Sequence, residues 1–491
     1  MGQMILRGVP AVLTQDMWWF DGDGRDEGAR VDGQSGRGVP RAMLVLLALV
    51  GCADFLFLDH APGLSLPVFA LLVAVAIRAL LGRKQGLTGP ALLLGLSVLP
   101  VIEHVQALSV AFLLGGSSVA LCWAALGSCK GMGAALRRFA WLIPVLGVRQ
   151  AGQGVRLLRA QAGHGWMGRL WQGWAFPVAG LLIFGTLILS ANPVLSEGLN
   201  RALRLDLRVE RLMFWLGMAL LLWPVLAVAL DAGLLQPRGI RTRVPLSWGL
   251  GINAHSVSNS LVTFNLVMLV QTGLDAAFLW AGAALPDGMN YATYAHRGAY
   301  PLVLTALLAG AFALAARPYL AERPVLKRLV YLWLAQNVLL VVSSLLRLSL
   351  YVEAYGLTYL RVHAVIWMGL VASGLCLTGW QIFARRSNLW LMTRCAGLGL
   401  GTLYVCCFVN FAALIAESNL RHFGLRDPYY LCHLGPMSAQ PLMASRWELP
   451  CDVETPTINN WREWGFRADR VIRSLPQNPE PEGWHENTRG R

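Results

Sequence analysis

The sequence predicts an all-α, polytopic transmembrane helix bundle with about eleven spans, and three observations support this. Of the 491 residues, 56% are hydrophobic and only 14% are charged, whereas a soluble domain carries roughly 25% charged residues. Long apolar runs recur along the chain, and a spanning helix needs about 20 mostly apolar residues. The chain also contains 19 Trp, which suits a protein with two membrane interfaces, where indole rings settle.

The expected spans cover most of the chain. They are residues 42–58, 64–81, 88–102, 105–127, 174–191, 212–232, 257–282, 299–316, 326–350, 360–383 and 389–416. The third is short, contains Pro100 and ends before Glu103, so a re-entrant segment is the alternative to a full span.

Basic residues alternate between successive loops and predict the orientation of the bundle. Lys and Arg collect in cytoplasmic loops, and here they precede span one and follow spans two, four, six, eight and ten, beginning with Arg37 and Arg41 and ending with Arg385, Arg386 and Arg394. We therefore expect the N-terminus inside and the C-terminus outside. The loop between spans five and six is an exception with four Arg, which we interpret as an amphipathic helix paired with its own acidic residues.

Three parts follow from this topology. Residues 1–41 form a cytoplasmic N-terminal segment, partly disordered, and the first span acts as an uncleaved signal. Residues 42–417 form the bundle, within which 134–173 is amphipathic and lies on the inner leaflet. Residues 418–491 form a small polar extracytoplasmic tail. The net charge of +14 follows from the basic cytoplasmic loops, so the expected partner is the lipid bilayer and not nucleic acid.

Polar side chains inside the spans are the first candidate site, because such residues are costly and usually face a bundle interior or a cavity. Gln271 lies one helical turn before Asp275, and Gln336 and Arg347 share a helix face. Asp275 and Arg347 lie at similar depth with opposite charge, so we expect them to pair. The full candidate set is Asp54, Gln271, Asp275, Gln336, Arg347, Glu353, Arg361 and Asn410. A packing ion pair, a functional cavity open to the outside, and unpartnered interfacial residues all fit this pattern.

The loop 285–300 between spans seven and eight is the second candidate. It gathers Asp287, Tyr291, Tyr294, His296 and Arg297 in a short stretch. A loop that covers the bundle and a lid that faces a ligand are both compatible with it.

Cys432 and Cys451 are the two cysteines of the predicted tail. Disulfides persist in oxidising compartments such as the periplasm, and the expected topology places the tail there. We therefore predict a disulfide between them, with free thiols or a mixed pair with another protein as the alternative.

Motifs that carry known chemistry are missing from the sequence. There is no H-E-x-x-H, G-x-S-x-G or G-x-x-x-x-G-K-[ST], and histidines do not cluster with carboxylates at the spacing of metal ligands. No catalytic residue, metal or cofactor is predicted, and an enzyme is the less favoured class.

Several stretches carry a family resemblance. They are Ala191–Leu195, Val262–Asn265, Gly282–Gly288, Tyr294–Pro301, Leu334–Asn337, Leu350–Thr358, Asn410–Leu414 and Tyr430–Gly435. Through them the chain resembles an uncharacterised family of bacterial inner-membrane proteins, domain of unknown function 4173, which is related to domain of unknown function 4153. The resemblance implies a multi-pass protein of the bacterial inner membrane and implies no activity. The two cysteines of the tail depart from the family pattern.

Three functions remain open. The first is a non-catalytic envelope scaffold or sensor whose outward-facing loops contact an envelope protein. The second is a transporter or permease with a polar site near Asp275 and Arg347. The third is a membrane-embedded transferase that acts on lipid-linked substrates with Asp287, His296 or Glu353.

Overall fold

The computed structural model describes residues 39–81, 86, 88–129, 131–143, 180, 184–185, 187–188, 209–236, 254–277, 304–305, 307–314, 316–321, 324–423, 427–445, 447 and 449–475. Within these ranges the chain forms helices and short connections, and no β-strand occurs. The chain divides into two compact units. Unit 1 comprises residues 1–101 and 111–240, and unit 2 comprises residues 102–110 and 241–491. This division runs differently from the predicted boundary at residues 417 and 418.

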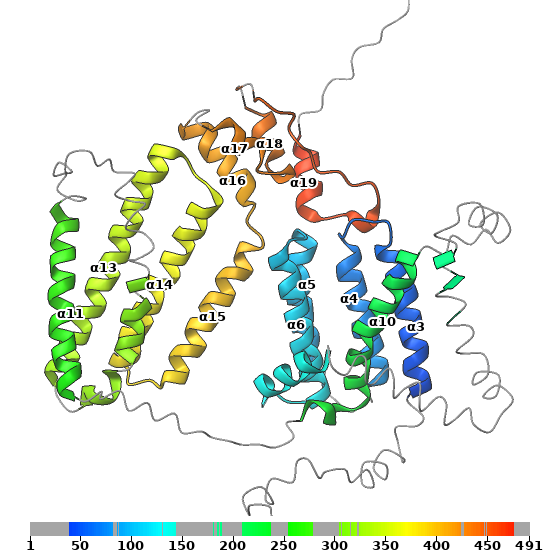
Figure 1. The fold of residues 1–491 in the computed structure, drawn as a ribbon, viewed down its shortest axis with the longest axis horizontal. Coiled ribbons are helices and arrows are strands. Elements are labelled where there is room, and N and C mark those ends of the chain that lie inside the picture. The colour runs from blue at the N-terminus through cyan, green and yellow to red at the C-terminus, as the bar shows by residue number, and fades with distance from the viewer. Residues whose placement is uncertain are drawn as a thin grey trace, which may run out of the picture. The chain divides into compact units, whose positions relative to one another are not determined.

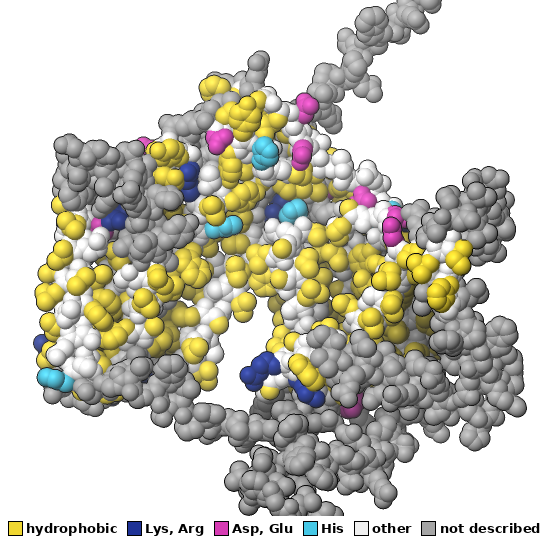
Figure 2. Space-filling view, in the orientation of Figure 1, with side chains coloured by type: hydrophobic (Ala, Val, Ile, Leu, Met, Phe, Trp, Pro, Cys, Tyr) yellow, Lys and Arg dark blue, Asp and Glu magenta, His cyan; other side chains and the backbone are white. Residues whose placement is uncertain are grey.

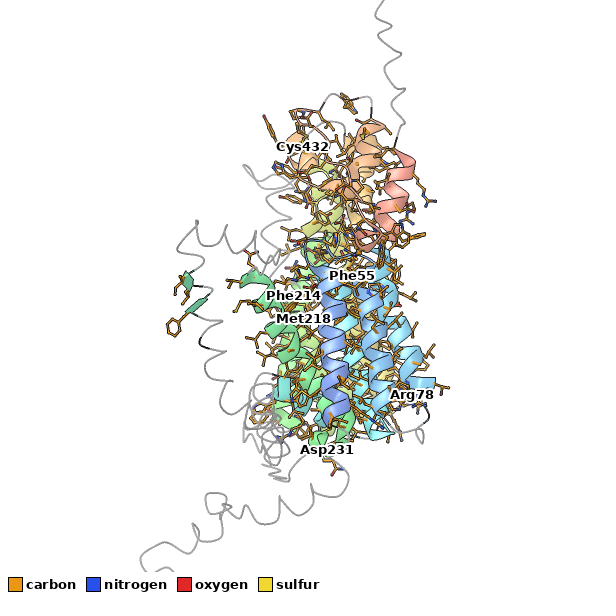
Figure 3. All side chains as sticks on the ribbon, turned by 90° about the vertical axis from the view of Figure 1, so that its right-hand side faces the viewer. Phe55, Arg78, Phe214, Met218, Asp231 and Cys432 are labelled. Carbon is orange, nitrogen blue, oxygen red and sulfur yellow. A yellow bond between two sulfur atoms is a disulfide. The ribbon has the colours of Figure 1, made fainter. Side chains whose placement is uncertain are left out.

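Unit 1 is built from helices (Figure 1). Its elements are α3 (Val39–Phe57), α4 (Ser65–Leu80), most of α5 (Thr88–Glu103), α6 (Ala107–Leu126), α10 (Val209–Leu230) and the 3₁₀ helix η2 (Ala232–Leu235). Among the described residues of this unit, buried apolar side chains form two small cores. Leu49 of α3 packs with Leu222 and Leu226 of α10 in one core. Phe55 lies toward one end of this unit, and Asp231, which caps η2, lies at the other end (Figure 3).

The second core of unit 1 contains part of the stretch that we expected to be amphipathic. Residues 132–143 are helical, and Phe139 and Leu142 are buried against Leu121 of α6 and Leu235 of η2. Trp141 is exposed, and Arg138 donates a hydrogen bond to the Leu234 carbonyl at 3.4 Å. This part of the stretch is therefore a short amphipathic helix that packs against α6 and η2 within unit 1. Residues 144–173 lie outside the described residues.

Unit 2 places four long helices side by side (Figure 1). They are α11 (Ala254–Asp275), α13 (Pro324–Tyr355), α14 (Tyr359–Phe383) and α15 (Asn388–Cys406). Leu261, Val330 and Met368 are buried in a core that α11, α13 and α14 share. Gly356 allows the sharp reversal between α13 and α14, because its φ of +77° is unfavourable for residues with a Cβ.

Residues 411–474 fold against the turn between α13 and α14 and the start of α14. We call this part the cap; it comprises α16 (Phe411–Ser418), η5 (Asn419–Phe423), α17 (Pro428–Cys432), η6 (Pro436–Ser438), α18 (Ala439–Met443), η7 (Trp461–Glu463) and α19 (Phe466–Ser474). Ile415, Leu431 and Leu442 are buried in its core together with Val362 of α14. The cap is thus a folded part of unit 2.

Seven of the described helices are long and apolar enough to cross a membrane. They are α3, α6, α10, α11, α13, α14 and α15, while α4 and α5 are apolar but shorter. Large hydrophobic side chains such as Leu92, Leu266 and Leu360 are exposed on the helices, and hydrophobic side chains cover much of the visible helix surface (Figure 2). Such surfaces require lipid and not water, so the predicted all-α membrane fold is confirmed.

The prediction of one helix over 389–416 is wrong. Helix α15 ends at Cys406 and α16 begins at Phe411, because the Asn410 side chain accepts a hydrogen bond from the Ala413 N–H and starts a new helix. Asn410 is therefore a helix cap and not a polar residue within a span.

Other expected spans differ in how far the structure describes them. Helix α5 continues through Pro100 for 16 residues, roughly 24 Å, which is shorter than a hydrocarbon core of about 30 Å. Within 174–191 and 299–316 only some residues are described, and those are helical. The number of spans and their orientation remain predictions.

Candidate functional site

Asp275 and Arg347 form a buried ion pair between α11 and α13. The Arg347 Nη2 donates to Asp275 Oδ1, and the two side chains are only 3% and 6% exposed. Gln271, one turn earlier on α11, donates its Nε2 to the same oxygen at 2.9 Å. The structure therefore brings together three of the predicted residues in one buried group.

Gln336 belongs to the same helix interface but lies nearer the middle of α13. Its Nε2 donates to the Asn265 backbone carbonyl at 3.3 Å, and Asn265 donates its Nδ2 to the carbonyls of Leu261 at 2.7 Å and Leu329 at 3.2 Å. We call the polar residues of this interface the α11–α13 seam: Asn265, Gln271, Asp275, Gln336 and Arg347.

Sequence reasoning missed Asn265, although a signal was present. Leu261, Asn265, Met268 and Asp275 are the buried residues that follow one face of α11, at the helical spacing of a packed stripe. Counting back along α11 from Asp275 at this helical spacing leads through Met268 to Asn265.

Asp54 pairs within unit 1 and not with the seam. Its Oδ1 accepts hydrogen bonds from Arg211 Nε at 2.9 Å and from Trp215 Nε1 at 2.8 Å. Arg211 lies in the first turns of α10, which begins at Val209, so it is part of a span. The guanidinium of Arg211 thus reaches across to α3, a contact that the sequence did not predict. The other three Arg of the expected self-paired helix lie outside the described residues, so that interpretation stays a prediction.

Arg361 and Glu353 do not join the seam among the described residues. Arg361 donates to the carbonyls of Tyr355, at 3.0 Å, and of Gly356, and its guanidinium lies over the Tyr351 ring at 4.4 Å. Glu353 is exposed. Arg361 thus fixes the turn between α13 and α14, because it binds the last carbonyls of α13, where a cation is favourable.

The loop 285–300, expected either to cover the bundle or to face a ligand, lies outside the described residues. Asp287, Tyr291, Tyr294, His296 and Arg297 all fall in 278–303. Their role in a ligand-facing loop stays a prediction.

A second buried ion pair joins the cap to the last residue of α5. Arg467 of α19 donates its Nε to Glu103 Oε1 at 3.1 Å and its Nη2 to the Cys407 carbonyl at 2.7 Å. Arg467 is buried, and the more exposed Arg470 lies 3.4 Å from the same carboxylate. One guanidinium therefore ties α19 to two helix ends.

The pKa of the adjacent His104 is lowered, chiefly by burial and next by the positive charge of Arg467, while Glu103 acts in the opposite direction. The imidazole is therefore neutral at neutral pH and adds no second buried cation. Because the folded-state pKa lies below the unfolded one, this residue favours folding above about pH 6.5 and loses that contribution as the pH falls.

Hydrogen bonds from two side chains of the cap, Asn419 and Tyr430, hold it to the turn between α13 and α14. The Asn419 side chain accepts from the Leu357 N–H at 2.6 Å and donates to the Leu357 carbonyl at 2.9 Å. The Tyr430 hydroxyl accepts from the Tyr359 N–H at 2.9 Å. Asn410 also donates to the Met437 carbonyl at 2.9 Å. These contacts satisfy backbone groups that helix ends leave unpaired.

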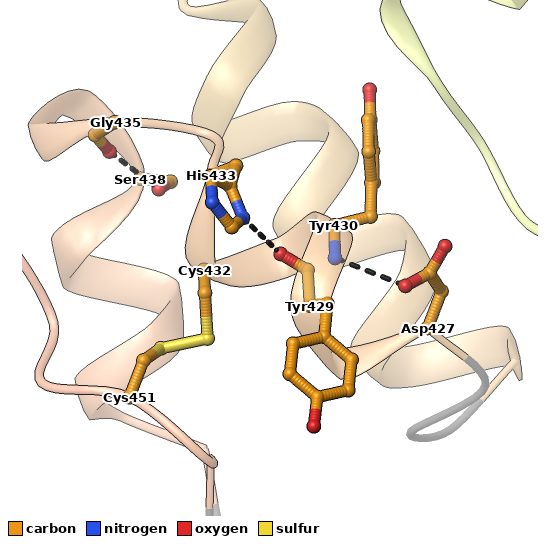
Figure 4. The surroundings of a disulfide bond; sticks show 8 residues. All are labelled: Asp427, Tyr429, Tyr430, Cys432, His433, Gly435, Ser438 and Cys451. Atoms are coloured by element: carbon orange, nitrogen blue, oxygen red, sulfur yellow. Dashed lines mark hydrogen bonds between the residues drawn. A yellow bond between two sulfur atoms is a disulfide. The ribbon is translucent and has the colours of Figure 1, made fainter.

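Cys432 and Cys451 form a disulfide within the cap (Figure 4). Their Cα atoms lie 6.2 Å apart, which is inside the usual range of about 4.4–6.8 Å. The bond links the end of α17 to the long connection before η7. Tyr429 lies beside it with an exposed ring.

Within the described residues no group of three or more His, Cys, Asp and Glu is placed to hold a metal ion. A groove is present in unit 2. The groove has a volume of about 620 Å³ and lies between α14 and α15. Gly397, Gly401 and Ile366 are among the residues that line it, and Thr402 contributes a hydroxyl. Sequence reasoning did not predict it.

Together, the fold and these contacts define a multi-pass α-helical membrane protein with a folded C-terminal cap. The chain belongs to the family described as Domain of unknown function (DUF4153), whose model matches residues 42–444. No curated protein and no solved structure shows detectable similarity to it. The matching family is the one that the resemblance named as a relative. Membership of domain of unknown function 4173 and a bacterial inner-membrane location stay predictions.

Proposed function

We propose that this protein is a non-catalytic scaffold or sensor of the bacterial inner membrane, whose cap stands on the extracytoplasmic side and contacts an envelope protein. The observation that carries the proposal is the construction of the cap. The cap is held in one arrangement on the helix ends by three kinds of contact. These are the buried ion pair of Arg467, the hydrogen bonds of Asn419 and Tyr430, and the disulfide. A fixed surface of this kind suits recognition of a partner, because little ordering entropy is lost on binding.

The positions that the cap touches support its placement outside. Glu103, Leu357 and Cys407 lie at the end of α5, in the turn between α13 and α14, and after α15. The alternation of basic loops assigns all of these positions to the same, extracytoplasmic side. The disulfide supports the same assignment, since an oxidising compartment maintains it.

The exposed aromatic residues of the cap support a binding role. Tyr429 is 70% exposed, Trp461 49% and Trp447 47%. Tyr and Trp are enriched at protein interfaces, where they combine a large apolar surface with a polar atom. A protein partner is thus the expected ligand of this surface.

A transporter is the second candidate, and the α11–α13 seam is the observation that favours it. Ionisable residues in spans often mark a pathway for ions or substrates. In this seam, however, Asp275 and Arg347 neutralise each other, which is also what a packing role requires. The cap therefore supports the scaffold or sensor more directly.

A photo-crosslinking experiment in intact cells tests the proposed function. A photoreactive residue replaces Tyr429, Trp447 or Trp461 in turn, and Val270, which is exposed on α11, serves as the matched lipid-facing control. We expect one discrete protein adduct from at least one cap position and none of that size from Val270. The adduct should disappear when Cys432→Ser opens the cap. Absence of any protein adduct from all three cap positions would reject the role in partner binding.

A further inference from the structure

The α11–α13 seam contains buried acceptor oxygens that nothing in the described chain satisfies. Asn265 Oδ1 and Gln336 Oε1 are buried and have no hydrogen-bond partner among the described residues. Their side chains are only 6% and 8% exposed. Inside a membrane each such group costs several kcal/mol, so an unsatisfied pair in one interface requires an explanation.

The orientation of the two amides is fixed by their donors. The Asn265 NH₂ group faces the carbonyls of Leu261 and Leu329, and the Gln336 NH₂ group faces the Asn265 carbonyl. Rotating either amide by half a turn would place its oxygen against a carbonyl oxygen, which cannot donate. The unsatisfied atoms are therefore oxygens.

The two amides adjoin near the middle of their helices. Asn265 lies halfway along α11, Gln336 lies in the central part of α13, and the hydrogen bond from Gln336 to the Asn265 backbone joins them directly. Trp333, one turn before Gln336, packs its ring on Phe264 at 5.4 Å between centroids, and its Nε1 is also unpartnered among the described residues. In the described part of the chain, two acceptor oxygens and the Trp333 N–H thus lie without a hydrogen-bond partner near the middle of this interface, while Asp275 Oδ2 and the Arg347 Nε do so at its end.

The two amide oxygens that lack a partner in the described chain indicate which kind of ligand the interface can bind. Neutral amide oxygens suit a hard cation, which binds oxygen ligands. Asp275 lies ten residues further along α11, about 15 Å away, and it is already paired with Arg347. Without a free carboxylate the site suits one positive charge and not two. Water molecules around the ion would complete its shell and accept from the Trp333 N–H.

From this arrangement we propose that Asn265 and Gln336 form a site for a partly hydrated monovalent cation, Na⁺ or K⁺, in the middle of the α11–α13 seam. The amide oxygens bind the ion or its water, and the rings of Trp333 and Phe264 form one wall. The Asp275–Arg347 pair lies at the end of α11, separate from the site. This inference goes beyond the proposed role of the cap and does not depend on it.

Thermal unfolding of the purified protein in detergent tests the site. The midpoint is measured at constant ionic strength while NaCl or KCl replaces choline chloride, whose quaternary ammonium does not take oxygen ligands as Na⁺ and K⁺ do. A ligand that binds only the folded state raises the midpoint in a saturable way. We expect such a rise with Na⁺ or K⁺ and no equivalent rise with choline.

Two substitutions assign the response to the seam. Asn265→Leu and Gln336→Leu each remove an oxygen ligand with little change in volume, so the cation concentration for half-maximal response should rise at least about tenfold. Thr378→Val is the matched control, because Thr378 is buried in the same unit but donates its hydroxyl to Gly374. It should keep the full response.

A charged substitution keeps the test informative if a Leu variant does not fold. Gln336→Glu places a carboxylate at the site, so its midpoint should depend on the cation more steeply than that of the unaltered protein. Equal midpoints in all three salts would overturn the proposal and leave water as the ligand. A cation response that persists unchanged in both Leu variants would overturn it as well.

Discussion

Asp275→Asn should destabilise the detergent-solubilised protein by about 3–5 kcal/mol, the usual cost of removing one partner of a buried ion pair. The substitution leaves the Arg347 guanidinium buried without its counter-charge, and a guanidinium cannot lose its proton in a protein. Arg347→Gln should also destabilise the protein, because the buried Asp275 carboxylate loses its counter-charge and keeps the Gln271 amide as a donor. Denaturant or thermal unfolding of the three proteins measures both effects.

The double variant distinguishes a pair from two independent residues. If Asp275 and Arg347 act together, Asp275→Asn combined with Arg347→Gln loses clearly less stability than the sum of the single losses. Additive losses would mean that the two residues contribute separately. Arg78, an Arg of α4 outside the seam, provides a control: Arg78→Gln should leave the effect of Asp275→Asn unchanged.

Glu103→Gln should loosen the cap and lower its unfolding free energy by about 3–5 kcal/mol. The buried Arg467 would lose its negatively charged partner and keep neutral acceptors such as the Cys407 carbonyl. Arg467→Gln should be milder, because Arg470 remains within 3.4 Å of the Glu103 carboxylate. Limited proteolysis of the purified protein, with cleavage between α16 and α19 as the readout, measures how readily the cap opens.

Arg473→Gln is the matched control on the same helix. Arg473 pairs with Asp469 on the exposed face of α19, and surface pairs contribute roughly 0–1 kcal/mol. Its cleavage rate should match that of the unaltered protein. If Glu103→Gln is cleaved no faster than Arg473→Gln, the buried pair does not hold the cap.

The membrane fold could be predicted because apolar length and the scarcity of charge are properties of the sequence itself. Asp275 and Arg347 were found by the same means, since charge is conspicuous within an apolar run. The contact between Arg211 and Asp54 was missed because the two residues lie far apart in the sequence. The break between α15 and α16 was missed because apolar residues continue through it, and only the capping side chain of Asn410 marks it.

The long-range contacts that anchor the cap could not be predicted from the sequence. Its polar composition suggested a small tail, whereas the structure anchors it through Arg467, Asn419 and Tyr430 to residues distant in the chain. Such contacts depend on tertiary proximity, which spacing and composition do not reveal. The disulfide was accessible to prediction because topology and cysteine count together restricted the pairing.

The state of Cys432 and Cys451 in intact cells tests most directly whether a folded cap lies outside the membrane. A membrane-impermeant maleimide that retards migration on a gel is applied to spheroplasts before and after an impermeant reductant, in a variant whose remaining cysteines are replaced by Ala or Ser. We expect no labelling before reduction and two labels afterwards. Labelling without reduction would contradict the disulfide, and no labelling after reduction, with two labels once the membrane is permeabilised, would place the cap on the cytoplasmic side.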